Sequence, residues 1–295
     1  MRKQISAVGV MVVLSLAGSA YAGGSGTSGA LVLTQGLNAR ALAMGESFTA
    51  IGGGLASMHY NPAGLGFMRT RQASVLFKRG MADDNTGAID AGFVSGKGAV
   101  ALGLLYYSGG NMELIDSAGN ERTVNAETDY VVNVSYGYPL SRAISIGGSA
   151  KALSTRLVEE VSATAYALDL GMMCRIKSIG IGFAVQNIGD KIKYIGEGDN
   201  LPLTMRIGAS YVSKSLTAGV DAVKQNDDEI TEHIGMEYTL QKTVSIRGGY
   251  KLGCDTNSIT LGLGLRILKG CQFDYAMALM NEFDNAHYAS VTFKL

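Results

Sequence analysis

From Gln72 to the C-terminus, apolar and polar residues alternate along the chain with a period of two. Successive side chains of a β-strand point to opposite faces, so this period predicts strands with one apolar and one polar face. Residues 258–266 illustrate the pattern: one row holds Ile259, Leu261, Leu263 and Leu265, and the other holds Ser258, Thr260, Gly262, Gly264 and Arg266. The sequence therefore predicts an all-β fold from residue 72 onward.

The same pattern, applied along the whole chain, predicts fourteen strands. Most of them have about the 9–11 residues that a tilted strand needs to cross the hydrocarbon layer of a membrane. They cover residues 72–79, 86–95, 98–107, 129–138, 143–153, 162–172, 178–187, 203–213, 217–224, 231–240, 243–252, 257–266, 271–280 and 286–295.

The connections between the predicted strands alternate in length. Longer ones, such as 108–128 and 188–202, follow odd-numbered strands, whereas short ones, such as 96–97 and 241–242, follow even-numbered strands. An up-and-down outer-membrane barrel has tight periplasmic turns and longer extracellular loops, and its even strand number returns both termini to the periplasm. A soluble β-sandwich has no reason to sort its loops in this way. The expected fold is a 14-stranded antiparallel transmembrane β-barrel.

Charged residues fall on one of the two rows. The apolar rows of 129–138, 203–213 and 258–266 contain no Asp, Glu, Lys or Arg. The opposite rows carry Asp90, Lys151, Asp169, Arg206, Asp221, Glu237, Arg247, Lys251 and Asp274. An Arg or Lys that faces lipid at mid-depth costs about 2–4 kcal/mol, so we expect the apolar row to face outward. A water-soluble barrel would reverse the two rows, and alternation alone fits either arrangement.

The composition narrows the class of protein further. The chain has 295 residues with 25 Lys+Arg and 25 Asp+Glu, whereas a nucleic-acid binder would show a basic excess. Mean hydropathy is +0.16, and outside the N-terminus no apolar run approaches the ~18 residues of a spanning helix. Only 17% of residues are charged. These values exclude a helical membrane protein and suit a membrane barrel.

The first 22 residues are typical of a secretory signal. Arg2 and Lys3 form a positive n-region, residues 7–17 an apolar h-region, and residues 20–22 (AYA) a signal-peptidase site. The alternative is a short buried helix. The predicted domains are a signal peptide at 1–22, an N-terminal segment at 23–71 and a transmembrane β-barrel at 72–295.

Residues 23–71 do not alternate, and residues 36–45 predict a short helix that ends at glycine. A barrel of fourteen strands is wider than the eight-stranded kind that side chains alone fill, so its lumen is either a water channel or occupied. The N-terminal segment is available to fill it as a plug. The alternatives are a periplasmic tail and an open porin.

The run from Asn38 to Gly64, which closes with Asn61, Pro62, Ala63 and Gly64, resembles the PorV/PorQ-like group within the FadL-type outer-membrane transporter family. The resemblance implies a bacterial outer-membrane barrel whose N-terminal hatch contains this Asn-Pro-Ala-Gly motif. It also implies transport of hydrophobic small molecules such as long-chain fatty acids. The PorV-like branch implies an alternative, which is an interaction component of a protein secretion system.

Three interior cations, Arg206, Arg247 and Lys251, are candidates for contact with a ligand in the lumen, where one of them would pair with a carboxylate head. We expect no catalytic residue, metal site or cofactor: the three histidines are far apart, and the glycines at 52–54 lack the Lys-Ser/Thr of a phosphate loop. The chain is therefore not expected to be an enzyme. The expected partners are a hydrophobic small molecule or lipid, outer-membrane lipids and secretion-system proteins.

Overall fold

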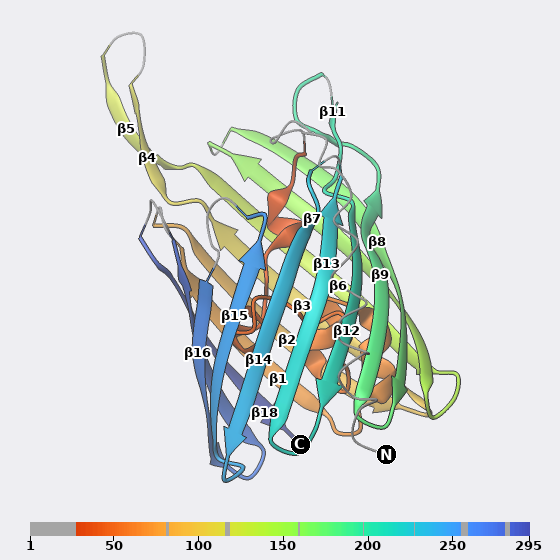
Figure 1. The fold of residues 1–295 in the computed structure, drawn as a ribbon. Helices are drawn as coiled ribbons and strands as arrows, with labels where there is room; N and C mark the ends of the chain where they lie inside the picture. The colour runs from red at the N-terminus through yellow and green to blue at the C-terminus, as the bar shows by residue number, and fades with distance from the viewer. Residues whose placement is uncertain are drawn as a thin grey trace, which may run out of the picture.

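A computed structural model describes residues 28–80, 83–115, 119–158, 160–196, 198–226, 228–254, 259–280 and 284–295. Within these residues, fourteen antiparallel strands form a closed barrel (Figure 1). Chain neighbours pair along the sheet, and β18 closes it against β1. The barrel strands are β1 (Gln72–Arg79), β2 (Asn85–Ser95), β3 (Gly98–Ser108), β6 (Glu127–Pro139), β7 (Ile144–Leu157), β8 (Val161–Ile176), β9 (Ile179–Gly189), β12 (Thr204–Val212), β13 (Leu216–Gln225), β14 (Thr231–Leu240), β15 (Val244–Leu252), β16 (Ile259–Leu268), β17 (Cys271–Leu279) and β18 (Ala286–Lys294).

Each predicted strand corresponds to one of these barrel strands, and the predicted loop alternation is also observed. Short turns, such as residues 96–97 and 177–178, lie at the end of the barrel where β18 stops, which we call the short-turn end. Longer connections, such as 109–126 and 190–203, lie at the other end, the long-loop end. The first barrel strand begins and the last one ends at the short-turn end, where Gln72 is paired with Lys294.

Two hairpins at the long-loop end are absent from the prediction. β4 (Asn111–Ile115) pairs with β5 (Glu121–Asn125), and β10 (Ile192–Lys193) pairs with β11 (Gly198–Asp199). The β4–β5 hairpin extends beyond the rest of the rim (Figure 1). These segments have no lipid-facing row, so they lack the alternation that identifies the barrel strands.

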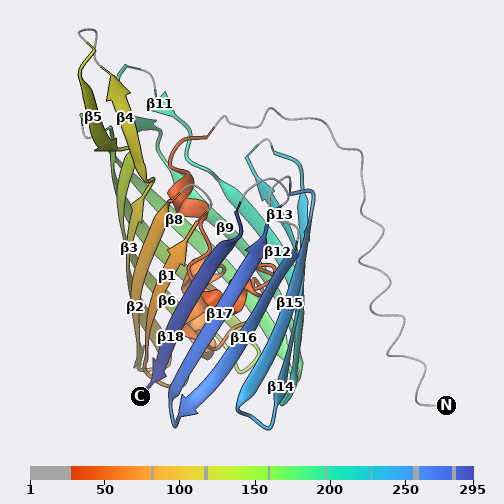
Figure 2. The ribbon, with the colours of Figure 1, turned by 90° about the vertical axis from the view of Figure 1, so that its left-hand side faces the viewer.

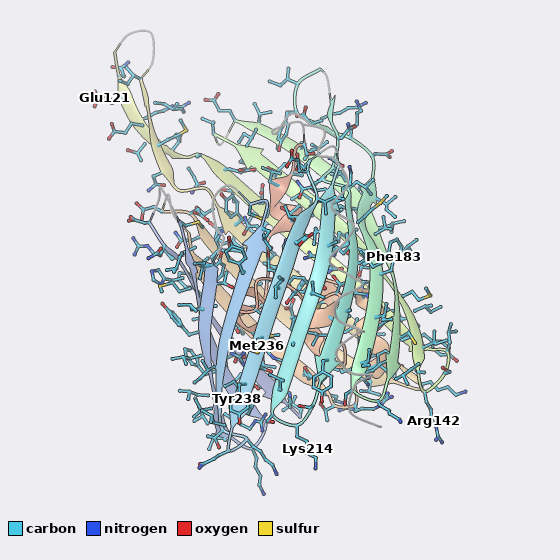
Figure 3. All side chains as sticks on the ribbon, in the orientation of Figure 1. Glu121, Arg142, Phe183, Lys214, Met236 and Tyr238 are labelled. Atoms are coloured by element: carbon cyan, nitrogen blue, oxygen red, sulfur yellow. The ribbon has the colours of Figure 1, made fainter. Side chains whose placement is uncertain are left out.

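The outer wall is apolar, as the sequence predicts. Ile259, Leu261, Leu263 and Leu265 are each 44–52% exposed, and Phe183, Met236 and Tyr238 also project outward (Figure 3). All of the predicted interior charges, from Asp90 to Asp274, are buried inside the barrel. The outer row therefore faces lipid and the inner row faces the lumen. No helix in the described residues has the length and apolar character needed to cross a membrane.

The described part of the N-terminal segment, which we call the luminal segment (residues 28–71), runs through the barrel. Ser28 bridges to Asn200 at the long-loop end, and Arg71 accepts a hydrogen bond from the Leu295 amide at the short-turn end. The even strand number thus returns both ends of the barrel, Gln72 and Lys294, to the short-turn end, whereas the first described residues of the luminal segment lie at the long-loop end. Figure 2 shows the segment inside the wall. The predicted signal peptide, residues 1–22, lies outside the described residues.

The luminal segment contains only short helical pieces. They are η2 (Leu31–Thr34), α1 (Ala39–Leu42), η3 (Leu55–His59) and η4 (Pro62–Phe67). Asn38 caps α1, because its side chain accepts a hydrogen bond from the Ala41 amide. Helix α1 packs against β16, β17 and β18, whereas η4 packs against β3, β6, β7 and β8. The segment thus contacts opposite sides of the wall.

Candidate functional site

The motif Asn61, Pro62, Ala63 and Gly64 fastens the luminal segment to the wall. The Asn61 amide group donates to the Thr49 carbonyl at 2.9 Å and to the Met172 carbonyl in β8 at 3.1 Å, while its Oδ1 accepts from the Ala63 amide at 3.1 Å. Pro62 occupies the first position of η4, where a missing N–H costs nothing. All four motif residues are buried.

Glycines of the barrel wall face the motif. A Cβ added at Gly147 in β7 would overlap the backbone of Pro62 and Ala63, and one added at Gly171 in β8 would overlap the Asn61 side chain. Both positions therefore require glycine for close approach of the two backbones. This contact explains part of the high glycine content, which is 40 residues.

A second anchor is the buried carboxylate of Asp221 in β13. Its Oδ2 accepts hydrogen bonds from the Phe48 and Thr49 amides, both at 2.9 Å, and from Thr49 Oγ1 at 2.6 Å. Sequence analysis places Asp221 in the lumen but assigns it no role. Neither the residue type nor its spacing signals that it would capture a backbone segment far away in sequence.

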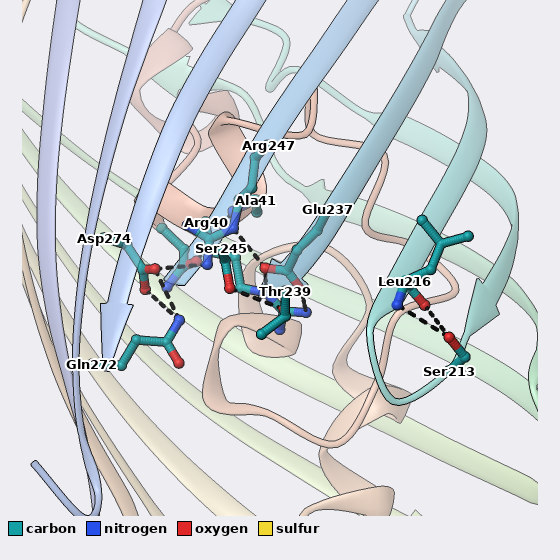
Figure 4. Close-up of polar contacts among 11 residues, drawn as sticks. Arg40, Ala41, Ser213, Leu216, Glu237, Thr239, Ser245, Arg247, Gln272 and Asp274 are labelled. Carbon is teal, nitrogen blue, oxygen red and sulfur yellow. Dashed lines mark hydrogen bonds and ion pairs between the residues drawn. The ribbon is translucent and has the colours of Figure 1, made fainter. Parts of the chain in front are cut away.

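Buried ion pairs cross the lumen at several depths. Arg40 donates to Glu237 at 2.7 Å, and Arg247 bonds Glu237 at 2.6 Å and Asp274 at 2.8 Å, so the four side chains form one network (Figure 4). Lys251 pairs with Glu46 in the luminal segment. A hydrogen bond joins His59 Nε2 to the Asp90 carboxylate at 2.8 Å. These contacts hold the luminal segment at one depth, since breaking a buried pair leaves an uncompensated charge.

The three predicted ligand-contacting cations do not form one site. Arg206 and Lys251 line the same luminal cavity of about 210 Å³, together with Glu46, Tyr60 and His233. Arg206 donates to the Glu46 carbonyl at 3.2 Å, and its guanidinium lies 5.3 Å from the centre of the Tyr60 ring. Arg247 lies nearer the short-turn end of β15 and is engaged by Glu237 and Asp274. Its role as a ligand contact stays a prediction.

The cavities of the lumen are small, and their linings mix polar and apolar side chains. Besides the 210 Å³ cavity, whose mouth is lined by Asp228 and Glu229, one of about 120 Å³ lies toward the short-turn end beside Arg40, Asp274 and Lys294. A third, of about 30 Å³, lies between η2 and β3. None of these three spaces is an apolar tube.

The long-loop end carries a different kind of concavity. An open groove of about 530 Å³ lies between the β4–β5 hairpin, the β7–β8 connection and the β10–β11 hairpin. We call it the rim groove. Its lining residues are mainly apolar and comprise Leu114, Leu157, Val158, Glu160, Val161, Tyr194, Ile195 and Asp199.

Several solved structures of bacterial proteins share this architecture. The toluene transporter TbuX of Ralstonia pickettii is 16% identical with a TM-score of 0.66, and the alignment covers 89% of this chain and 99% of TbuX. The toluene transporter TodX of Pseudomonas putida is 11% identical with a TM-score of 0.67, covering 89% and 99%. A FadL homologue of Pseudomonas aeruginosa is 10% identical with a TM-score of 0.57, covering 87% and 98%. At these identities the similarity establishes the fold.

The fold and the apolar outer wall define a FadL-like β-barrel of the bacterial outer membrane. The sequence profile of the Type IX secretion system protein PorV matches residues 25–236, and the chain belongs to this family. Among curated protein sequences, none matches the chain. The family and the similar structures are described as secretion and transport proteins rather than enzymes, in agreement with the sequence-based expectation.

Proposed function

We propose that this barrel is an interaction component of a protein secretion system, and that it engages exported polypeptides at its long-loop end. The observation that supports the proposal best is a contrast between two kinds of space: the largest luminal cavity described is small and lined by several charged side chains, whereas the rim groove is wide and mainly apolar. A hydrocarbon placed in the polar cavity would leave buried charges without water or partners. Membership of the PorV family supports the same conclusion.

The rim groove has the features of a polypeptide site. Ile195, which lines the groove, is 78% exposed at the tip of the β10–β11 hairpin. Ile115 does not line the groove but follows the lining residue Leu114 at the end of β4, and it is 66% exposed. Exposed apolar residues gathered in a groove mark an interaction site. Within the described residues β4 and β5 pair only with each other, so their outer edges present backbone donors and acceptors to an added strand.

Export of cargo proteins by cells carrying groove variants tests this proposal. Leu114→Asp combined with Ile195→Asp places charges on both walls of the groove, and we expect surface display of exported proteins to fall while the barrel stays in the outer membrane. The matched control is Ile230→Asp, since Ile230 is also exposed at this end (57%) but does not line the groove. Unchanged export in the groove variant would exclude this function for the groove.

A second candidate is transport of a hydrophobic small molecule such as a long-chain fatty acid. Its support is the shared fold with structures described as toluene transporters, together with Arg206 and Lys251 in one cavity. An acidic head group would displace Glu46 from Lys251, since both are anions that pair with the same ammonium. Displacement would loosen the luminal segment.

Lipid analysis of the purified protein, paired with uptake by cells, separates the two candidates. If transport is the function, Lys251→Gln and Arg206→Gln lower fatty-acid uptake, whereas cargo export stays normal. Glu46→Gln is the control that breaks the same ion pair but keeps both cations. Protein without bound lipid, with uptake unchanged in all three variants, would exclude the transport candidate.

A further inference from the structure

The turns at the short-turn end of the barrel carry only basic charged side chains. Each of the six short turns carries one lysine or arginine, and none carries Asp or Glu. We call these side chains the turn cations, and they are Lys97, Arg142, Lys177, Lys214, Lys242 and Lys269. All six are exposed, and exposed Arg69, Arg71, Arg266 and Lys294 lie at the same end. Figure 3 labels Arg142 and Lys214 at this rim and Glu121 at the opposite one.

The acidic residues occupy other parts of the barrel, although the chain as a whole has no net charge. Eight of them, including Glu46 and Asp221, are buried or nearly so, inside the barrel or at its long-loop end, and the others belong to the long connections and the strand ends beside them. No salt bridge in the described part of the chain involves a turn cation. Within the described residues, the turn cations are therefore available to pair with charges outside the protein.

The turn cations lie at the edge of the apolar wall. Exposed Leu140 and Ile144 flank Arg142 within two residues, and exposed Ile176 and Ile179 flank Lys177. Every turn cation is at most three residues from an exposed apolar side chain. A strand rises about 3.3 Å per residue, so each cation lies roughly 10 Å or less beyond such a side chain. That depth is the one occupied by lipid head groups, since turns of two to four residues do not reach farther into water.

The turn cations also surround the barrel instead of gathering on one side. They come from every short turn, from the one between β2 and β3 to the one between β16 and β17. A folded protein partner would cover only part of such a ring, whereas a shell of lipids contacts all of it. Clustered Lys and Arg at this depth attract anionic lipids.

We propose that the turn cations bind the head groups of anionic phospholipids in the periplasmic leaflet of the outer membrane. The ring would collect these lipids around the barrel and fix its vertical position and tilt. Salt screens exposed charges, with a Debye length of about 10 Å at 0.1 M and about 3 Å at 1 M. The preference of the protein for anionic over neutral lipids would therefore weaken as the salt concentration is raised. This site is independent of the rim groove and of the luminal cavity.

Electron paramagnetic resonance of lipids in contact with the protein tests the proposal. The full-length protein is placed in phosphatidylcholine vesicles that contain either spin-labelled phosphatidylglycerol or spin-labelled phosphatidylcholine. The expected result is a roughly twofold to fivefold preference for phosphatidylglycerol at low salt, which declines at 1 M salt. Replacement of all six turn cations by glutamine should abolish the preference.

The matched control replaces six exposed cations of the long-loop end: Arg79→Gln, Arg122→Gln, Arg156→Gln, Lys191→Gln, Lys193→Gln and Lys224→Gln. This control variant should keep the preference for phosphatidylglycerol.

If the sixfold turn variant fails to fold, a threefold variant provides the test. The variant with Lys97, Lys177 and Lys242 changed to glutamine should lose about half of the preference for phosphatidylglycerol. The proposal is overturned if the native protein shows no preference, or if the folded turn variant keeps it. It is also overturned if only an acidic periplasmic protein binds the ring.

Discussion

At the scale of single residues, two buried polar side chains hold the luminal segment in place. Asn61 joins that segment to β8, and Asp221 joins it to β13. Both use side-chain atoms to satisfy backbone groups of the irregular luminal segment, such as the carbonyl and the amide of Thr49. Irregular chain that is buried away from water requires such partners. Each residue therefore fixes the backbone around it as well as the contact to the wall.

Replacement of Asn61 by alanine should destabilise the segment by about 1–3 kcal/mol, because the Thr49 and Met172 carbonyls and the Ala63 amide lose their partner. Protease cleavage within residues 39–68 of the folded protein in detergent measures this effect. Asn111→Ala, at an exposed position of β4, is the control and should leave cleavage unchanged. Equal cleavage of both variants would contradict the anchoring role.

Asp221→Asn keeps the shape of the side chain but removes its charge. Hydrogen bonds to a charged acceptor contribute about 1.5–3 kcal/mol, so hydrogen exchange of the Phe48 and Thr49 amides should become roughly 10–100-fold faster. Exchange followed by mass spectrometry on the peptide containing both residues provides the measurement. Asp228→Asn, at the mouth of the luminal cavity, should not change that peptide. An unaltered rate in the Asp221 variant would show that the carboxylate is not the anchor.

At the scale of elements, η4 packs on β6, β7 and β8 through positions that exclude any side chain. Gly147→Ala should cost about 1–3 kcal/mol, since the new methyl group overlaps the backbone of Pro62 and Ala63. Gly248→Ala in β15 is the matched control, because the nearest atom to its new methyl group would lie 3.9 Å away. Thermal unfolding in detergent compares the two variants, and equal melting temperatures would contradict the packing described.

The barrel strands could be predicted because lipid imposes a strict rule on their outer row. Beyond the hydrocarbon layer the outer row need not be apolar, and the strand limits could not be predicted there. β7 continues to Leu157 and β8 reaches Ile176, four residues beyond their predicted limits, since strands in water or at the rim still pair without an apolar row. The β4–β5 and β10–β11 hairpins escape prediction for the same reason.

The site was less predictable than the wall. The Asn-Pro-Ala-Gly motif was identified from a family resemblance, but its partners on β7 and β8 follow from backbone contacts with glycine that leave no pattern in the sequence. The sequence pattern groups Arg206 and Lys251 with Arg247 as lumen cations, whereas the structure places only the first two in one cavity. Alternation specifies which side of the wall a residue faces, and says nothing about which acidic partner lies within reach across the lumen.

At the scale of the whole molecule, the luminal segment decides whether the barrel conducts. With residues 28–71 inside, the remaining cavities are small, and we expect little ion current across a planar bilayer. Removal of residues 28–68 should open a water-filled pore with stable conductance, because a barrel of this strand number is too wide for wall side chains to fill. Comparable currents from both proteins would indicate that the segment does not block the lumen.

The pairing of β1 with β18 has a consequence for the order of assembly. It joins residues from the two ends of the sheet, such as Gln72 and Lys294, so it forms only after all other strands exist. The luminal segment precedes β1 and touches both halves of the wall. We therefore expect the sheet to close around the luminal segment, with the β1–β18 pairing forming last. A newly assembled barrel would then never have an empty lumen that conducts ions.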